Sequence, residues 1–245
     1  MRSAAKWQIA GLTALGLATV GVVAVAVAPD KTEATAGPNL VAPVAAAPVI
    51  ARPGVKLVDN PVVLFAGDSL SDGWYATEEV KGFRPIVSGA LTKARPSSTF
   101  VQAHKAGYTT QQVADTFPVP EGINLAVVQL GTNDVTKKTN PGMFAGQYAA
   151  YVDAIKSKNP DAGLICLGSF FHAAEQSDAI DKVIEAECNK HDGFYLDITA
   201  VYVTAGYRGP AGTPTWLGKS DMGHPNDLGH ARIAEMVLSQ IITEG

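Results

Sequence analysis

The chain has 245 residues, of which 47% are hydrophobic and 17% charged, and its formal net charge is −4. This length and composition suffice for one well-packed core and exclude a chain that is disordered throughout. The sequence has no run rich in Lys and Arg and is mildly acidic. It therefore lacks the clustered positive charge with which proteins bind nucleic acid or anionic membrane surfaces.

Residues 1–28 have the features of an export signal. Arg2 and Lys6 precede an uncharged run from Trp7 to Ala28 that is rich in Ala, Val, Leu and Gly. The run is long enough to span a bilayer but only weakly apolar, so a signal peptide and a signal anchor both stay open, and we favour cleavage or loose anchoring. Small-x-small cleavage sites end at Ala26 and Ala36. Either outcome predicts a secreted or extracytoplasmic protein, with membrane anchoring through residues 7–28 in the second case.

Residues 29–54 are rich in Ala, Pro and Val, with prolines at positions 38, 43, 48 and 53. This composition is typical of a semi-rigid, extended linker. A disordered remnant behind a cleaved signal is the alternative. One folded domain is expected over residues 55–245.

The rest of the chain alternates strand-like and helix-like segments. Short apolar runs predict buried parallel strands at residues 62–65, 99–103, 125–130, 164–167 and 194–198. Helical patterns lie near residues 78–94, 109–116, 142–158, 177–190 and 227–242. Such alternation predicts an α/β fold with a five-stranded parallel sheet covered by helices on both faces. We detect no internal repeat.

The only two cysteines, Cys166 and Cys188, fall on a predicted strand and on the helix that follows it. In an exported protein a disulfide between them could persist. Two separate buried thiols are the alternative, because cysteine often serves as a small apolar core residue. The spacing alone does not decide between them.

Four short motifs stand out, and the first three directly follow predicted strands. They are Gly67-Asp68-Ser69, Gly107 within residues 106–110, residues 131–134 with the sequence Gly-Thr-Asn-Asp, and residues 221–225 with the sequence Asp-Met-Gly-His-Pro. Ligand sites of open parallel sheets lie at the carboxyl ends of strands. If the strand order is 2-1-3-4-5, the strand before Ser69 lies between those that lead to Gly107 and Asn133. The motifs are then expected to converge at one sheet edge.

These residue types suit acyl transfer. A serine such as Ser69 becomes a nucleophile only beside a base, for which His224 is the candidate. Asp221 can hydrogen-bond one imidazole nitrogen and leave the other to face Ser69. The backbone N–H groups of Ser69 and Gly107 and the side-chain amide of Asn133 are candidate donors to an oxyanion. Asp134 is expected to cap a turn, and Asn226 or Asp227 to cap the last helix.

At these motifs the chain resembles the SGNH hydrolases, also called the GDSL esterase/lipase family, over roughly residues 60–243. The resemblance implies a flavodoxin-like three-layer α/β/α sandwich, Ser69 as nucleophile, Asp221 and His224 as the rest of a triad, and Gly107 and Asn133 as oxyanion donors. One departure is Gln102, where the family usually has Asn five positions before the glycine. The motif that contains Ser69 also lacks the Gly-x-Ser-x-Gly pattern of the α/β-hydrolase elbow.

Several further residues are candidates for the substrate pocket. The aromatic residues Trp74, Tyr75 and Trp216 could wall a pocket for an acyl group or a sugar, with ordinary loop packing as the alternative. His172 follows the fourth strand and could line the same pocket, although a surface or packing role stays open. The remaining histidines are expected to be packing or surface residues, with His230 on the last helix.

The sequence therefore predicts an exported serine esterase that acts on short acyl or acetyl esters of small molecules or carbohydrates. The alternatives are a lipase or lysophospholipase, an O-acyltransferase with the same triad, and a non-catalytic surface binding protein. Metal-ligand spacing, a phosphate loop and a dinucleotide fingerprint are absent from the sequence, so we expect no cofactor and no metal. The oligomeric state does not follow from the sequence.

Overall fold

The computed structural model describes residues 53–172 and 175–242. The predicted export segment at residues 1–28 and nearly all of the predicted linker at residues 29–54 lie outside the described residues. Among the helices that the structure does describe, none is both long enough and apolar enough to cross a membrane.

The centre of the fold is a five-stranded parallel sheet with the order β3-β2-β4-β5-β6. The strands are β2 (Val62–Gly67), β3 (Thr99–His104), β4 (Leu125–Gln129), β5 (Gly163–Leu167) and β6 (Phe194–Leu196). This is the 2-1-3-4-5 order under which the motifs were expected to converge at one sheet edge. Gly67 pairs with His104 on one side and with Gln129 on the other, so three strands end level with one another.

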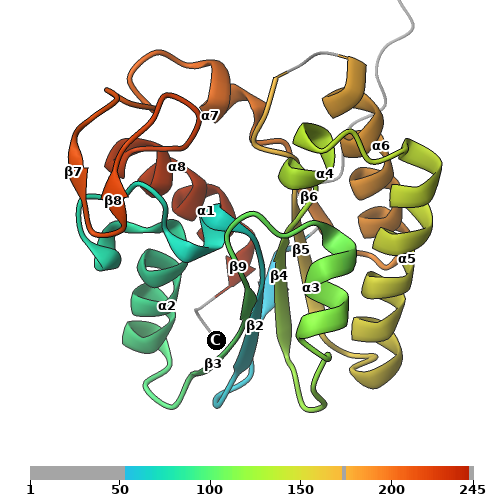
Figure 1. The fold of residues 1–245 in the computed structure, drawn as a ribbon. Coiled ribbons are helices and arrows are strands. Elements are labelled where there is room, and N and C mark those ends of the chain that lie inside the picture. The colour runs from blue at the N-terminus through green and yellow to red at the C-terminus, as the bar shows by residue number, and fades with distance from the viewer. Residues whose placement is uncertain (1–52, 173–174, 243–245) are drawn as a thin grey trace, which may run out of the picture. The chain divides into compact units, whose positions relative to one another are not determined.

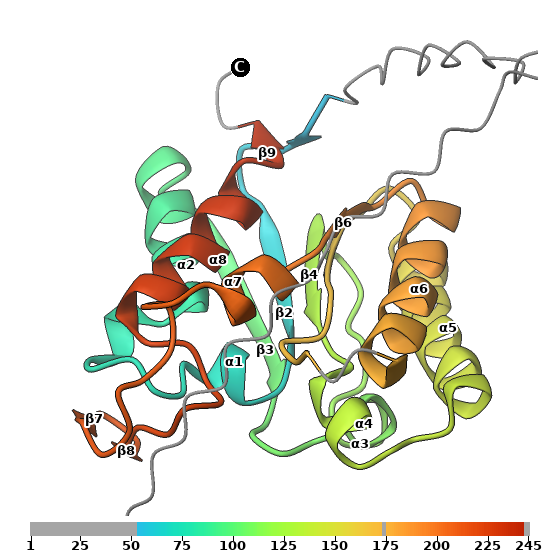
Figure 2. The ribbon, with the colours of Figure 1, turned by 90° about the horizontal axis from the view of Figure 1, so that it is seen from above.

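Helices cover both faces of the sheet, as Figures 1 and 2 show. The helices on one face are α2 (Phe83–Ala94), α7 (Thr199–Val203) and α8 (Asp227–Leu238). Those on the other face are α3 (Thr110–Thr116), α5 (Pro141–Lys158) and α6 (Glu175–Lys190). The expected three-layer α/β/α fold is thereby confirmed.

The sheet strands read as continuous apolar runs because both of their faces are buried. In β2, Leu64 and Ala66 pack against the helices of one layer, whereas Val63 and Phe65 pack against those of the other. Successive side chains of a strand point to opposite faces, so each layer receives every second residue. The two cores on either side of the sheet hold the carboxyl ends of the strands in place.

The structure corrects the predicted elements at several boundaries. The last helix ends at Leu238 rather than near residue 242, because Ile241–Ile242 (β9) pairs in parallel with Val55–Lys56 (β1). The predicted helix at residues 78–94 is divided by the extended backbone of Gly82 into a short 3-10 helix, η1 (Glu79–Lys81), and α2. A small hairpin of β7 (Pro214–Thr215) and β8 (Gly218–Lys219) was not predicted, since two-residue strands carry no readable periodicity.

A disulfide joins Cys166 on β5 to Cys188 on α6. Both cysteines are buried. The alternative of two separate thiols is therefore excluded, and the covalent link ties α6 to the sheet.

Candidate active site

Ser69 is the first residue of the short helix α1 (Ser69–Asp72), and only Asp68 separates it from the end of β2. The carboxylate of Asp68 caps this helix and accepts a hydrogen bond from the Leu70 N–H at 3.1 Å. Gly67 lies so close to Ser71 that a Cβ atom at position 67 would collide with its hydroxyl. Because Ser69 opens the helix, its own N–H has no acceptor within α1 and is available to a ligand.

The side chains of Ser69, His224 and Asp221 form one hydrogen-bonded row. Ser69 Oγ lies 2.9 Å from His224 Nε2, and His224 Nδ1 lies 2.9 Å from Asp221 Oδ2. Asp221 Oδ1 accepts hydrogen bonds from the backbone N–H groups of Gly223 at 2.8 Å and His224 at 2.9 Å. Partial burial acts to raise the pKa of Asp221, but these N–H groups and the imidazole outweigh it and hold the pKa below its usual value. Asp221 is therefore an ionised partner for the imidazole at neutral pH.

The loop after β3 brings the N–H of Gly107 to the same place. Gly107 has φ of +77°, a left-handed conformation that glycine adopts readily and other residues resist. Its two neighbouring peptide groups are held: Asp72 accepts from the Ala106 N–H at 2.6 Å, and Lys137 Nζ donates to the Gly107 carbonyl at 2.6 Å. No described residue accepts a hydrogen bond from the Gly107 N–H itself. The direction of the Gly107 N–H is thus set by the hydrogen bonds of the peptide groups before and after it.

Asn133 lies on the short helix α4 (Thr132–Thr136), which follows β4. Its side-chain Nδ2 is buried and has no acceptor among the described residues. The neighbouring Asp134 accepts hydrogen bonds at 3.0 Å from both the N–H and the hydroxyl of Thr110. Asp134 therefore has a capping role, as expected, but at the first turn of α3 rather than in its own segment. This contact fixes α4 against the helix that follows Gly107.

The segment after α1 is held by the last helix. His230, on α8 as predicted, is fully buried; its Nε2 lies 2.7 Å from the carbonyl of Trp74 and its Nδ1 accepts from the Phe83 N–H at 3.3 Å. Burial lowers the pKa of His230 to about 4, so the ring is neutral and donates from Nε2. Asn226 caps the N-terminus of α8, whereas Asp227 instead accepts from Thr77. These contacts anchor the loops that carry Trp74 and His224.

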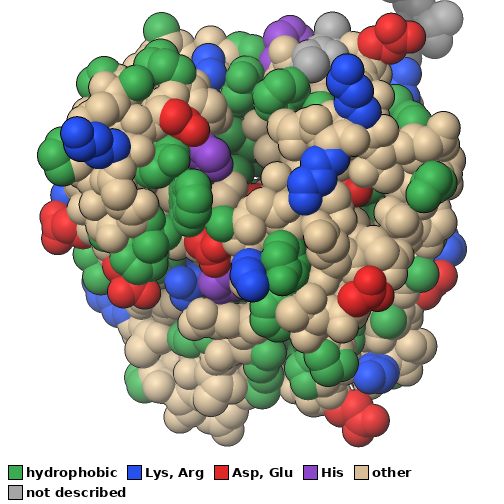
Figure 3. Space-filling model, viewed as in Figure 1, with side chains coloured by type: hydrophobic (Ala, Val, Ile, Leu, Met, Phe, Trp, Pro, Cys, Tyr) green, Lys and Arg blue, Asp and Glu red, His purple; other side chains and the backbone are tan. Residues whose placement is uncertain are grey.

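Two hollows meet at Ser69, Asn133 and His224. One, of about 210 Å³, has an apolar wall that includes Leu70, Phe170 and Phe171. The other, of about 300 Å³, is lined by Trp74, Ala106 and Gly107. In Figure 3, hydrophobic side chains gather around a hollow above the sheet, with a histidine at its margin.

The predicted pocket residues do not all reach this site. The rings of Trp74 and Tyr75 pack against His224, with centroid distances of 5.7 Å and 5.0 Å. Trp216 contributes to a further hollow beyond Trp74. His172 is exposed and lines a different hollow with residues of α6 and β6, and it is not among the residues that line the hollows at Ser69.

Sequence reasoning missed several residues around the site. Phe170 and Phe171 lie three and four residues after the end of β5, so the rule that selected Ser69 and Asn133, a position just after a strand, could have found them. No sequence motif indicates that Asp72 and Lys137 hold the loop that contains Gly107. Their partners lie 34 and 30 residues away in the chain, and only the folded chain brings them together.

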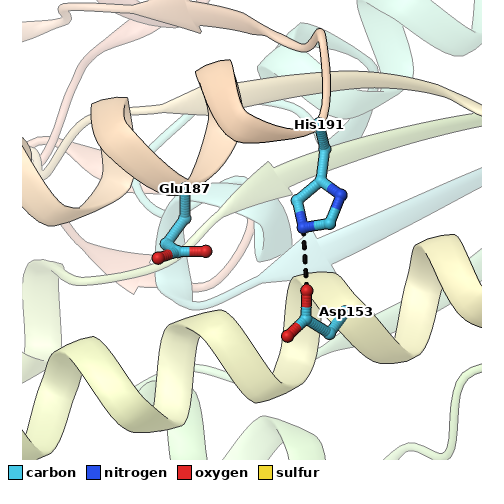
Figure 4. Close-up of side chains that lie close together, drawn as sticks. All are labelled: Asp153, Glu187 and His191. Atoms are coloured by element: carbon cyan, nitrogen blue, oxygen red, sulfur yellow. Dashed lines mark hydrogen bonds and ion pairs between the residues drawn. The ribbon is translucent and has the colours of Figure 1, made fainter.

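One group of potential metal ligands occurs in the described part of the chain, formed by Asp153, Glu187 and His191 (Figure 4). Asp153 Oδ1 lies 2.8 Å from His191 Nε2, and Lys190 Nζ lies 3.3 Å from Asp153 Oδ1 and 3.1 Å from Glu187 Oε2. The ammonium group already provides the positive charge that these carboxylates attract. The group is thus a surface ion-pair network between α5 and α6, and none of its residues lines the hollows at Ser69.

Comparison with solved structures finds the same fold in several esterases and lipases. TesA aligns with a TM-score of 0.57 and 17% identity over 73% of this chain and 97% of that protein. A family two carbohydrate esterase from Clostridium thermocellum, in complex with cellohexaose, aligns with a TM-score of 0.56 and 15% identity over 77% of this chain and 64% of that one. An extracellular lipase from Streptomyces rimosus aligns with a TM-score of 0.54 and 18% identity over 74% of this chain and 99% of the lipase. At these identities the likeness shows the fold.

No curated protein matches this sequence. A model of the GDSL-like lipase/acylhydrolase family, however, matches residues 65–232, a stretch that contains all four motifs. Since this match spans more than half of the chain, the protein belongs to the GDSL-like lipase/acylhydrolase family and is an enzyme that hydrolyses esters.

Proposed function

We propose that the protein is an exported serine esterase that cleaves short acyl esters through Ser69, His224 and Asp221. The observation that carries this proposal is the row of hydrogen bonds from Ser69 Oγ through the imidazole to the Asp221 carboxylate. Nucleophile, base and orienting carboxylate lie within hydrogen-bond reach of one another, which is the arrangement that activates a serine hydroxyl.

In the first half of the reaction, Ser69 Oγ attacks the acyl carbon while His224 Nε2 takes the hydroxyl proton. The N–H groups of Ser69 and Gly107 and the amide of Asn133 donate to the oxygen that becomes negative. The bond between the acyl carbon and the alcohol oxygen then breaks. His224 gives its proton to that oxygen, the alcohol leaves, and the acyl group stays on Ser69.

In the second half, water attacks the acyl-enzyme. His224 takes a proton from the water and later returns it to Ser69 Oγ as the carboxylic acid leaves. Asp221 stays ionised throughout and stabilises the imidazolium that forms twice in each cycle. Its depressed pKa favours this role.

The apolar hollow beside Ser69 supports a short acyl group. Its volume of about 210 Å³ is smaller than the roughly 300–1,000 Å³ of pockets that enclose drug-sized ligands. Phe170 is part of the lining of this hollow, and its N–H donates to the hydroxyl of Thr132 at 3.0 Å. A long lipid chain would extend out of the hollow into solvent, so acetyl and other short acyl groups fit the site better.

Export is supported by the disulfide between Cys166 and Cys188, because such bonds persist in oxidising compartments and are rare in the cytosol. The extracellular lipase from Streptomyces rimosus shares the fold. The N-terminal segment at residues 1–28 has the sequence features of an export signal. We therefore assign the enzyme to the outside of the cytoplasm.

The proposal is tested with the purified protein and p-nitrophenyl acetate. Ser69→Ala and His224→Ala are each expected to lower kcat by about four to six orders of magnitude, because each removes a member of a unit that acts together. A fluorophosphonate probe should label the wild-type protein at Ser69, and mass spectrometry of the labelled peptide locates the label. Full activity of Ser69→Ala, or labelling elsewhere, would overturn the assignment.

A further inference from the structure

A groove that does not include the apolar residues Leu70, Phe170 and Phe171 leads away from Ser69. The hollow of about 300 Å³ at Ser69 shares Trp74 and Ala106 with a larger one of about 470 Å³. The larger hollow also includes Arg84, Gln102, Lys105 and Trp216 in its lining. We call these two adjoining hollows the Trp74–Trp216 groove.

The two tryptophans of the groove are held in place by contacts of their polar atoms. Trp216, beside the β7–β8 hairpin, donates its indole N–H to the carbonyl of Gly73 at 3.0 Å, yet 38% of the residue remains exposed. Trp74 is fixed through its carbonyl by His230 and packs its ring against His224. Since the indole N–H of Trp216 is already used, its exposed part is apolar ring surface.

The polar side chains of the groove have unused hydrogen-bonding capacity. Arg84 is only 8% exposed, and its Nε donates to the Ser71 carbonyl at 2.9 Å. No residue in the described ranges accepts a hydrogen bond from its Nη groups, although Arg84 lines the groove. Gln102 is exposed beside it with its side-chain amide unpaired among those residues. The carboxylates of Asp72 and Glu79 line the same hollow, but neither accepts a hydrogen bond from the guanidinium. The Nη groups are therefore available to a ligand that accepts hydrogen bonds.

A sugar ring matches this combination of surfaces. Its C–H face is apolar and stacks on an aromatic ring. The hydroxyls at its edge accept hydrogen bonds from a guanidinium, and they both accept from and donate to an amide. An alkyl alcohol would cover Arg84 and Gln102 without satisfying them, which a polar site penalises strongly. We propose that the Trp74–Trp216 groove binds the alcohol part of the ester, and that this alcohol is an oligosaccharide acylated at the sugar next to Ser69. This inference rests on the proposed function, because it takes Ser69 as the point of cleavage.

The test compares two acetyl esters that differ only in the alcohol: p-nitrophenyl acetate and a chemically acetylated trisaccharide, with acetate release measured for both. Trp216→Ala is expected to lower kcat/KM for the trisaccharide about tenfold more than for p-nitrophenyl acetate, the equivalent of one lost stacking contact. The loss should fall on KM, because Trp216 does not touch the reacting atoms. Gln102→Ala changes an exposed position of a strand, which folding tolerates. It should also lower kcat/KM for the trisaccharide more than kcat/KM for p-nitrophenyl acetate.

The matched control is Met143→Ala, which removes an exposed apolar side chain that lines neither the groove nor the hollows at Ser69 and should leave both substrates unaffected. The inference is overturned if a wild-type enzyme that cleaves p-nitrophenyl acetate fails to cleave the trisaccharide. It is equally overturned if Trp216→Ala and Gln102→Ala change the two substrates by the same factor. Failure of the proposed function would look different, since Ser69→Ala would then keep its activity on p-nitrophenyl acetate.

Discussion

At the scale of single residues, the site contains buried hydrogen-bond donors that no described residue satisfies and that are therefore available to a ligand. Asn133 is the clearest case, because its Nδ2 is shielded from solvent and meets no acceptor in the described structure. An unpaired buried donor costs free energy unless a ligand satisfies it. In the proposed mechanism, this donor binds the oxygen that becomes charged only during the reaction.

We therefore predict that Asn133→Ala lowers kcat for p-nitrophenyl acetate by about 10²- to 10³-fold, the cost typical of one lost oxyanion donor. KM should change much less, because the interaction strengthens only in the transition state. Asn133→Asp has the same shape but offers acceptors and a negative charge, so it should be at least as damaging. Steady-state kinetics measure both, and a wild-type kcat in either variant would exclude Asn133 from the oxyanion site.

The backbone N–H of Gly107, the second proposed donor, also depends on its surroundings. Asp72 and Lys137 hold the peptide groups on either side of the Gly107 N–H, and Asp72 also contacts His104 Nδ1. Only glycine takes the positive φ at position 107 without strain. The direction of one N–H thus depends on residues from three separate segments of the chain.

At the scale of elements, the level ends of β2, β3 and β4 bring the motifs together. Each of these strands passes directly into a short loop or helix, and the register places Gly67 beside both His104 and Gln129. A slip of one residue in any pair would move its motif along the sheet edge and turn its side chains to the other face. The packed helices on both sides prevent that slip.

The disulfide belongs to this scale because it joins an element of the sheet to one that covers it. The double variant Cys166→Ala/Cys188→Ala is expected to lose about 2–4 kcal/mol of unfolding free energy, since the reduced chain has more conformational freedom when unfolded. Urea unfolding monitored by tryptophan fluorescence measures the loss. Activity at 25 °C should remain, as neither cysteine lines the hollows at Ser69.

Dithiothreitol provides the control for this prediction. It should lower the urea midpoint of the wild-type protein and leave that of the double variant where it was. Equal midpoints for the oxidised wild type and the double variant would show that the bond adds no stability.

At the scale of the whole molecule, burial couples stability to pH. Burial lowers the pKa of His230 to about 4, whereas an unfolded histidine titrates near its usual value of 6.5. Between these values the unfolded chain binds a proton that the folded chain does not, so the free energy of unfolding falls as the pH drops from 6.5 towards 4. Asp68 acts in the opposite direction, because burial raises its pKa to about 7.

His230→Gln separates the two contributions. The variant should be less stable than wild type at pH 7.5, since it disturbs a fully buried site. Its unfolding free energy should also fall less steeply than that of the wild type between pH 6.5 and 4. The two slopes should differ by up to about 1.4 kcal/mol per pH unit, the contribution of one titrating group. Urea titrations at four pH values provide the measurement. Parallel curves for the two proteins would contradict the assigned role of His230.

Much of the fold was predictable from local patterns. The five sheet strands appear in the sequence as apolar runs because the sheet buries both faces, and strand–helix alternation indicates a parallel sheet. The strand order does not follow from these patterns; it agrees with the flavodoxin-like fold that the family resemblance implies. The disulfide, the β1–β9 pair and the break at Gly82 were not predictable in this way. The disulfide and the β1–β9 pair depend on contacts between segments far apart in the chain, and the extended backbone of Gly82 interrupts a helical pattern that continues on both sides of it.

The sequence by itself determined the family, the fold class and the residue types at the strand ends. The reason is that a motif directly after a buried parallel strand lies at the carboxyl edge of the sheet, where such sheets place their ligand sites. Only the tertiary structure decided which other residues join them. Phe170 and Phe171 enter the hollow at Ser69, His172 does not, and Trp216 reaches the groove beyond Trp74 from a hairpin more than a hundred residues later in the chain. The physical reason is that loop placement depends on long-range contacts such as Trp216 with Gly73 and His230 with Trp74, which no local pattern encodes.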